Sequence, residues 1–427
     1  MEDFLYFFSF QDPNVVFVVV GISFLSVSAA MVGTFTFLDK KALIGDAISH
    51  AVLPGVCLAF MAAGNKNPYW IVAGAFATGA LATYTISWIS QKTKLKEDTV
   101  IAAVLSIYFG IGIVFMTKLQ QTGNAALSGL DHFLFGNAIS IVGDDVWVYG
   151  TLALLTIFAI LSFYKEFQLL VFNKDFAKAL GLPVKRLEFF FNSLMVLAVV
   201  TGIQAIGVVL MAALLITPAA AARFWTDRLG MMLVIAVLTA LFAGIGGAYI
   251  SFTIPNMPTG PWVVVVLSIV AFASFLFSPK KGLVSRWIAT RSYQRKIHQD
   301  HILKALYHAK EKQLEGLPLA DIMKHFPHKA QETKDSIKHL NRIGYISDNV
   351  GFISLTTRGA REAERLVRLH RLWELYLAEH VNIATDHVHD MAGKIEHFLT
   401  PEIEAKLDAK LNYPDKDPHQ SNIPREK

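Results

Sequence analysis

The chain has 427 residues, 53% of them hydrophobic, and a formal net charge of +5 at pH 7. The charge is uneven, because residues 279–427 contain 25 of the 39 Lys and Arg, 20 of the 34 Asp and Glu, and 12 of the 14 His. One cysteine, Cys57, excludes an internal disulfide framework and a thiolate-held iron–sulfur or zinc centre. The composition therefore predicts an integral membrane protein followed by a soluble, histidine-rich part that begins near Pro279.

Nine apolar stretches come first, and a stretch needs about 20 residues to cross a hydrocarbon core roughly 30 Å thick. Residues 189–222 fit either two spans or one span and a re-entrant piece, so eight spans is an alternative count. Lys and Arg lie where alternate loops face the cytoplasm, which with nine spans puts the N-terminus outside and the C-terminal part in the cytoplasm. The predicted stretches are 14–38, 42–64, 69–90, 98–117, 145–164, 187–204, 206–222, 229–250 and 261–278.

Two ionisable residues, Asp46 and His50, lie within the second stretch. Residues four apart share one face of a helix, and a charge in a span costs ~2.5–3.5 kcal/mol on insertion scales and is usually functional. A carboxylate and an imidazole suit a divalent transition metal; the alternative is an Asp–His hydrogen bond that stabilises a kinked helix. Asp131 and His132, in a Gly-bounded segment, are expected to form an ordinary polar loop pair.

The longest polar stretch before the C-terminal part is Lys165–Arg186. It predicts a short amphipathic helix that ends just before Gly181 and Pro183. On the cytoplasmic face such a helix suits the docking of a soluble partner, and an ordinary interhelical loop is the alternative.

Five motifs occur in order: GDAISHAVLPG (Gly45–Gly55), GNAALSGLDHFLFGNA (Gly123–Ala138), KALGLPVKR (Lys178–Arg186), ALLITPAAAAR (Ala213–Arg223) and PTGPWVVV (Pro258–Val265). Together they resemble the membrane subunits of ATP-driven zinc, manganese and iron importers, over almost all of residues 10–278. The resemblance implies a homodimeric permease in which Asp46 and His50 line the metal route. It also implies an extracytoplasmic metal-binding protein and an ATPase that engages the short helix through Lys178, Ala179, Leu180 and Gly181. The sequence has no phosphate-cradling G-x-x-x-x-G-K-[ST] loop, so ATP hydrolysis is expected from another polypeptide.

After a basic segment at 280–297, predicted as a linker or a membrane-surface helix, the pattern changes. Three amphipathic helices and a hairpin that turns at Asn349–Gly351 predict a winged helix-turn-helix over residues 298–360. A winged helix that makes only protein contacts is the alternative to one that binds DNA. The third helix offers polar side chains suited to a major groove and to phosphates, namely Gln331, Lys334, Lys338 and Arg342.

Residues 361–427 are predicted as a helical metal-binding and dimerisation domain, with one long helix over 357–380 and another over 385–399. The first helix carries His370 and Glu374, four residues apart. Imidazole and carboxylate groups from two packed helices can coordinate Mn²⁺, Fe²⁺ or Zn²⁺, and solvated surface residues are the alternative reading. The second helix carries His389, Glu396 and His397.

Three further segments are LTTRGAREAERLVRLHRLWELYL (Leu355–Leu377), VHDMAGKIEHFLTPEIEAKLD (Val388–Asp408) and YPDKDPHQSNIP (Tyr413–Pro424). They resemble the iron- and manganese-dependent repressors typified by the diphtheria toxin repressor, over about residues 300–425. The resemblance implies one metal site at His370, Glu374 and His389, and part of another at Glu396 and His397. Gly393 stands where the family has Cys or Glu, and His301 and Lys304 where it has acidic or thioether ligands. The second site is therefore expected to be altered or absent.

The sequence thus predicts an all-α polytopic membrane bundle of eight or nine helices over residues 1–279, followed by the soluble domains. The expected function is that of a permease subunit, not an enzyme, which imports manganese, zinc or iron and carries a cytoplasmic metal-sensing domain. The alternative for the C-terminal part is a metal-dependent DNA-binding repressor. An ion-gradient-driven carrier is disfavoured, because few acidic residues lie deep in the spans.

Overall fold

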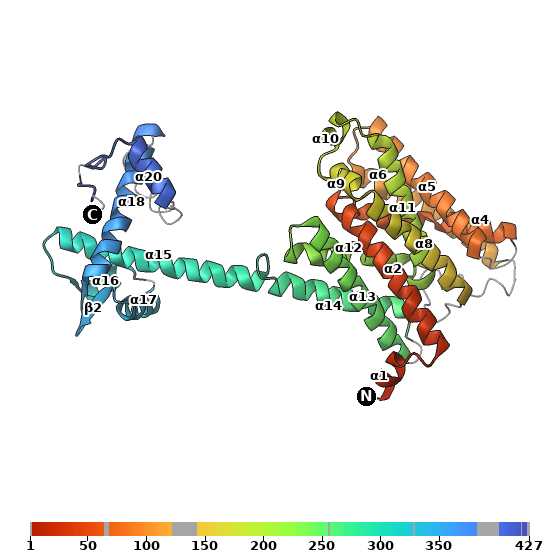
Figure 1. Cartoon of the computed structure of the whole chain (residues 1–427), viewed down its shortest axis with the longest axis horizontal. Coiled ribbons are helices and arrows are strands. Elements are labelled where there is room, and N and C mark those ends of the chain that lie inside the picture. The colour runs from red at the N-terminus through yellow and green to blue at the C-terminus, as the bar shows by residue number, and fades with distance from the viewer. Residues whose placement is uncertain are drawn as a thin grey trace. The chain divides into compact units, whose positions relative to one another are not determined.

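The computed structural model describes residues 2–63, 68–121, 143–254, 257–327, 329–381, 401–419 and 421–424. These residues form two compact units, Met1–Arg286 and Trp287–Lys427, and both are mainly helical (Figure 1). The boundary falls inside one helix, α15 (Leu283–Glu311), so the basic segment after the membrane bundle is helical from Leu283 onward.

The first unit consists only of helices in its described part. Its elements are α1 (Glu2–Phe8), α2 (Pro13–Leu38), α3 (Ala42–Ala51), α4 (Leu53–Ala63), α5 (Pro68–Lys92), α6 (Glu97–Gln120), α8 (Gly143–Ser162), α9 (Tyr164–Phe172), α10 (Lys174–Ala179), α11 (Val184–Ile206), α12 (Val208–Trp225), α13 (Leu229–Thr253) and α14 (Thr259–Phe277). The N-terminal helix α1 and the short helix α10 lie at opposite ends of this bundle (Figure 1).

The prediction of an all-α polytopic bundle is confirmed. Among the described residues seven helices are long and apolar enough to cross a membrane, and α8 with α9, bent by 71°, makes an eighth if the pair is one span. The seventh predicted stretch, 206–222, corresponds to α12, whose apolar part, Met211–Trp225, is shorter than a usual span. It is separated from α11 by Gly207, which has a φ of +95° that glycine adopts easily.

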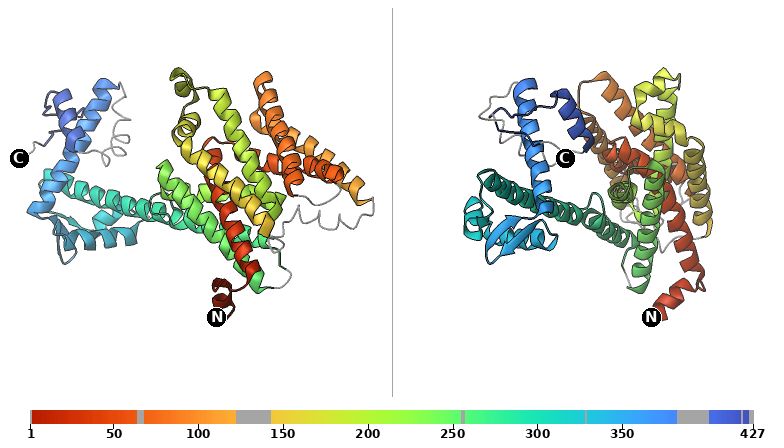
Figure 2. Two further views of the ribbon diagram at one scale, coloured as in Figure 1. Left: turned by 45° about the vertical axis from the view of Figure 1, so that its right-hand side comes forward. Right: turned by 60° about the vertical axis from the view of Figure 1, so that its left-hand side comes forward.

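Small residues let the helices of this bundle approach closely. A Cβ atom on Gly33 of α2 would lie 1.9 Å from the backbone oxygen of Leu215 in α12. One on Gly55 of α4 would lie 2.0 Å from the backbone oxygen of Gly74 in α5. Because lipid tails are as apolar as the side chains, such close van der Waals packing is a main source of helix association in membranes. Helix α2 accordingly runs beside α12 and α13, as both views in Figure 2 show.

The second unit begins with a winged helix-turn-helix, as predicted. Its elements are the C-terminal half of α15, β1 (Leu317–Pro318), α16 (Leu319–His325), α17 (Ala330–Arg342), β2 (Ile346–Asn349) and β3 (Phe352–Leu355), with the antiparallel strand order β1-β3-β2. Asn349 pairs with Phe352 across a turn in which Val350 and Gly351 both have positive φ, the geometry that suits a two-residue hairpin. The core beneath the wing contains Leu306, Leu340 and Ile353.

Helix α18 (Thr357–His380) begins and ends at the residues that the sequence predicts. It begins there because the Thr356 side chain accepts a hydrogen bond from the backbone nitrogen of Gly359 at 3.0 Å, which caps the helix. Helix α20 (Pro401–Lys410) lies against α18, with Leu407 in one apolar cluster with Leu372. The predicted helix over 385–399 lies outside the described residues.

A buried histidine joins α15 to α17 in the winged helix. His298 of α15 is 5% exposed, and its Nε2 lies 3.0 Å from the Thr333 hydroxyl of α17. Burial, followed by the charge of Lys329, lowers the pKa of His298, against the weaker opposing charge of Glu332. The folded pKa lies below the unfolded one, so the stability from the neutral ring is present above the unfolded pKa and is lost as the pH falls through it toward the folded pKa.

We therefore expect the amides of α17 to lose hydrogen-exchange protection several-fold when full-length protein is moved from about pH 7 to about pH 5, after correction for intrinsic exchange rates. His298→Gln keeps a hydrogen-bonding group but cannot become charged, so its protection should change little over the same interval. An equal loss in His298→Gln would assign the effect to other groups.

Candidate functional site

The predicted pair on the second apolar stretch lies on the short helix α3. The span containing it, Leu43–Ala63, is interrupted at Val52 alone, after which Leu53 and Pro54 begin α4. Proline is tolerated in the first turn of a helix because its missing N–H has no partner there. Helix α3 therefore ends at Ala51, one residue after His50.

His50 Nε2 lies 3.6 Å from Asp46 Oδ1, and the side chains are 19% and 40% exposed. This separation exceeds a normal hydrogen bond. Two ligands held about 2.1 Å from one metal ion lie about 3 to 3.4 Å apart, so a small adjustment brings both atoms onto the same ion. The separation is compatible with two ligands of one ion and is too long for a direct Asp–His hydrogen bond.

The second ring nitrogen of His50 supports the same interpretation. Nδ1 is buried and has no hydrogen-bond partner among the described residues, and the ring contacts Phe109 edge-on at 4.9 Å between centroids. A buried polar atom without a partner is often found at functional sites. Within the described ranges no group of three or more His, Cys, Asp or Glu could hold a metal ion, so the pair is a partial ligand set. Such a set suits an ion in transit.

The short helix predicted from the polar stretch is α10. Asn173 caps it by accepting a hydrogen bond from the backbone nitrogen of Phe176 at 2.9 Å, and Gly181, with a φ of +80°, follows its end. Phe176 and Leu180 are 52% and 57% exposed. Exposed apolar side chains at the tip of a loop are typical of a surface that another protein covers.

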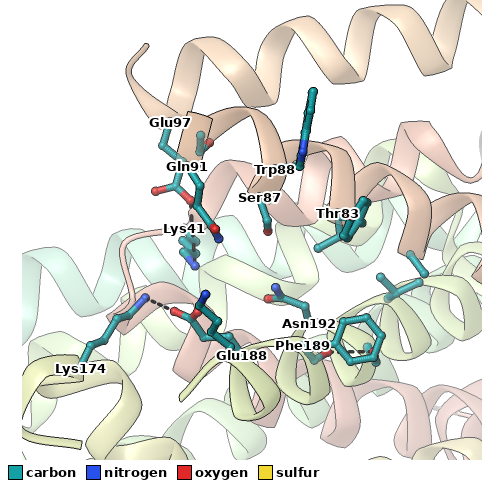
Figure 3. A pocket seen from close by; sticks show the side chains of 16 residues that line it. Lys41, Thr83, Ser87, Trp88, Gln91, Glu97, Lys174, Glu188, Phe189 and Asn192 are labelled. Carbon is teal, nitrogen blue, oxygen red and sulfur yellow. Dashed lines mark hydrogen bonds and ion pairs between the residues drawn. The ribbon is translucent and has the colours of Figure 1, made fainter. Parts of the chain in front are cut away.

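A cavity of about 440 Å³ lies beside this segment, between α5 and α11 (Figure 3). Trp88 and Phe189 line one part of it, and the polar side chain of Asn192 is also on its wall. Its charged lining residues are Lys41, Glu97, Lys174, Lys185 and Glu188. Sequence reasoning missed this group, since its members come from separate helices and share no motif.

In the second unit His370 Nε2 lies 3.1 Å from Glu374 Oε1, and both residues are buried. The alternative that they are solvated surface residues does not hold. His301 and Lys304 line a cavity of about 480 Å³ together with His370, so the structure brings three residues of the predicted metal region to one place. Four other predicted residues, His389, Gly393, Glu396 and His397, lie outside the described residues, as do Asp131 and His132.

The predicted DNA-facing residues of α17, Gln331, Lys334, Lys338 and Arg342, are all exposed. Lys338 and Arg342 also line a groove of about 770 Å³ between α15 and α17. Helix α15 contributes three further basic residues to this groove, Arg291, Arg295 and Lys296. The carboxylates of Glu332 and Asp335 line the same groove and reduce its net charge.

A bundle of seven or eight apolar helices long enough to cross a membrane, with a winged helix-turn-helix appended, defines a polytopic membrane protein in the described residues. Residues 11–278 match the ABC 3 transport family, and the chain belongs to this family. Residues 356–425 match the iron dependent repressor, metal binding and dimerisation domain.

Individual proteins agree with this assignment. The chain is 36% identical over 377 residues to the manganese transport system membrane protein MntC of Bacillus subtilis, covering 88% of this chain and 86% of that protein. It is also 36% identical over 275 residues to the zinc transport system membrane protein TroC of Treponema pallidum, covering 64% of this chain and 92% of TroC. A solved structure, PsaBC from Streptococcus pneumoniae in complex with a Fab, matches 67% of this chain and 99% of its own, with a TM-score of 0.60 and 28% identity.

Proposed function

We propose that the chain is the permease subunit of an importer that moves a divalent transition metal, manganese, zinc or iron, across the cytoplasmic membrane. The observation that carries the proposal is the pair of Asp46 and His50 on α3, at the break of a span. Its relatives include membrane proteins of manganese and zinc transport systems, which supports a metal as the substrate. All three metals accept imidazole and carboxylate ligands, so the pair does not choose among them.

The same proposal includes the partners. A separate ATPase docks on α10 and the turn after it, at Lys178, Ala179, Leu180 and Gly181, where Leu180 offers exposed apolar surface. A second copy of the chain completes the transport route, and an extracytoplasmic protein delivers the metal. The C-terminal unit lies in the cytoplasm, since basic residues flank the end of the last apolar helix at Lys280 and Lys281.

Accumulation of radioactive manganese or zinc in bacterial cells that lack their own high-affinity importers tests this function. Cells that express the chain with its ATPase and binding protein should accumulate the metal, and cells without any one of the three should not. Metal accumulation in cells that express the ATPase and the binding protein but not this chain would contradict the proposal.

A second candidate function concerns the C-terminal unit, which we propose to be a metal-responsive regulator. The buried contact between His370 and Glu374 supports a metal site, and the exposed basic face of α17 supports binding to DNA phosphates. The unit would either restrain transport when cytosolic metal is plentiful or act as a metal-dependent repressor. Full-length protein in nanodiscs should then bind the DNA upstream of its own operon in a metal-dependent and salt-sensitive way. If metal controls transport but the protein does not bind DNA, only the role in restraining transport remains.

A further inference from the structure

A network of ion pairs joins α10 to the start of α3. The Nζ atom of Lys174, the first residue of α10, lies 2.8 Å from Glu188 Oε1 in α11 and 3.5 Å from Asp39 Oδ1. The other carboxylate oxygen of Asp39 lies 3.1 Å from Lys41 Nζ. Figure 3 shows Lys174 directed toward Glu188 across the edge of the cavity, with Lys41 nearby. Lys174 therefore connects three separate segments of the bundle.

This network is more than an exposed surface pair. Asp39 has 15% of its side chain exposed and Lys174 has 34%. Burial lowers the pKa of Lys174, but the hydrogen bond to Glu188 and the charges of Asp39 and Glu188 outweigh it, so the pKa lies above its ordinary value. The ammonium group is thus held in its charged form. Exposed ion pairs contribute little because water and salt screen them, and these partly buried charges are screened less.

The turn at the centre of the network leads directly into the helix that carries the metal ligands. Asp39 follows the end of α2, Lys40 has a φ of +61°, and Lys41 immediately precedes α3. At 1.5 Å per residue, Asp46 lies about 7.5 Å along the helix from Lys41, and His50 about 13.5 Å. A displacement at Asp39 therefore reaches both ligands through one short helix.

The cavity beside the network provides room for such a displacement. Protein interiors are close-packed and resist motion where every neighbour is in contact. Here about 440 Å³ between α5 and α11 borders Lys41, Lys174 and Glu188 directly. The ion pairs join α10 to the turn, and the open volume allows both to move without displacing a packed side chain.

We propose that Lys174 is a positioning residue that couples movement of α10 to α3, so that ATPase motion changes the placement of Asp46 and His50. The inference rests on the proposed function of α10 as the ATPase contact. It adds a specific path: from Lys174 through Asp39 to the N-terminal end of α3. Lys174 touches neither the metal nor the ATP, and it acts only through the residues that it holds.

The test measures both ATP hydrolysis and metal uptake, with the complete transporter and its ATPase in lipid vesicles. Lys174→Met should lower the metal transported per ATP hydrolysed about tenfold, within the usual range for coupling between sites, while hydrolysis continues near the wild-type rate. Lys174→Arg should restore the ratio because it can make both ion pairs. Lys185→Met is the matched control, since Lys185 lines the same cavity but forms no ion pair among the described residues.

Asp39→Asn provides a second arm. It should cause the same loss of coupling as Lys174→Met, and the double variant should be no worse than either single one, because both remove the same connection. A wild-type ratio in Lys174→Met would overturn the inference. So would a parallel loss of hydrolysis and uptake, which indicates a purely structural brace. Absence of ATP-driven uptake by the wild-type protein would instead refute the proposed function.

Discussion

Asp46→Asn is expected to lower the initial rate of ATP-driven metal uptake roughly 100-fold, since changing even the groups that orient a metal ligand costs 10–100-fold in affinity or activity. The substitution keeps the size of the side chain but removes its charge. His50→Ala should have an effect of similar size, because it removes the only nitrogen ligand that α3 offers. Initial rates of radioactive manganese or zinc uptake, measured in vesicles that contain the complete transporter, check both expectations.

Ser49→Ala is the control for these variants. Ser49 neighbours His50 on α3 and is fully buried, and its hydroxyl donates to the backbone oxygen of Gly45 at 2.8 Å. Its removal perturbs the same helix without touching the ligand pair, so uptake should remain close to the wild-type rate. Wild-type uptake in both Asp46→Asn and His50→Ala would mean that the metal passes elsewhere.

The second large effect concerns the C-terminal unit. Metal added to the full-length protein should raise the hydrogen-exchange protection of α18, because an ion bound at His370 and Glu374 cross-links adjacent turns of that helix. In His370→Gln or Glu374→Gln, the metal concentration needed for this protection should rise at least about tenfold, in line with the loss of a ligand. Uptake itself should persist in both variants, since they lie outside the membrane route.

His380→Ala is the matched control for that experiment. His380 belongs to the same helix but is exposed at its end, where its ring stacks on Tyr376 at 5.0 Å between centroids. It should leave the metal response of α18 unchanged. An equal response in wild type, His370→Gln and Glu374→Gln would contradict a metal site on this helix.

Local signals explain which elements could be predicted from the sequence. Helix α18 was predictable at both ends because Thr356 supplies a capping oxygen and the apolar periodicity stops at His380. The hairpin of the wing was predictable because Gly351 follows Asn349 by two residues and adopts positive φ at the turn. The spacing of Asp46 and His50 alone was enough to place them on one helical face.

Features that depend on packing between distant segments could not be predicted in this way. The ion pair of Lys174 with Asp39 joins two turns that carry no shared motif, and only the folded bundle brings them together. The burial of Glu374 could not be predicted for the same reason, because the spacing of His370 and Glu374 does not show which segments pack over them. Strand β1 has only two residues, Leu317 and Pro318, too few to show an alternating pattern.

The departures from the repressor pattern have a defined place in the structure. His301 and Lys304 lie at the cavity that His370 also lines, and the resemblance to the repressors predicts a carboxylate or thioether ligand at the position of the cationic Lys304. A positive charge at this position opposes the binding of a second divalent cation. We therefore expect the altered second site to bind metal more weakly than the site that contains His370 and Glu374.

The source of energy for transport tests the account most directly. Vesicles that contain the purified chain, with and without its ATPase, can be supplied with ATP or with a proton or sodium gradient while metal uptake is followed. The account predicts uptake only when both the ATPase and ATP are present, and none from either gradient. Metal uptake driven by an ion gradient in vesicles that lack the ATPase would contradict it.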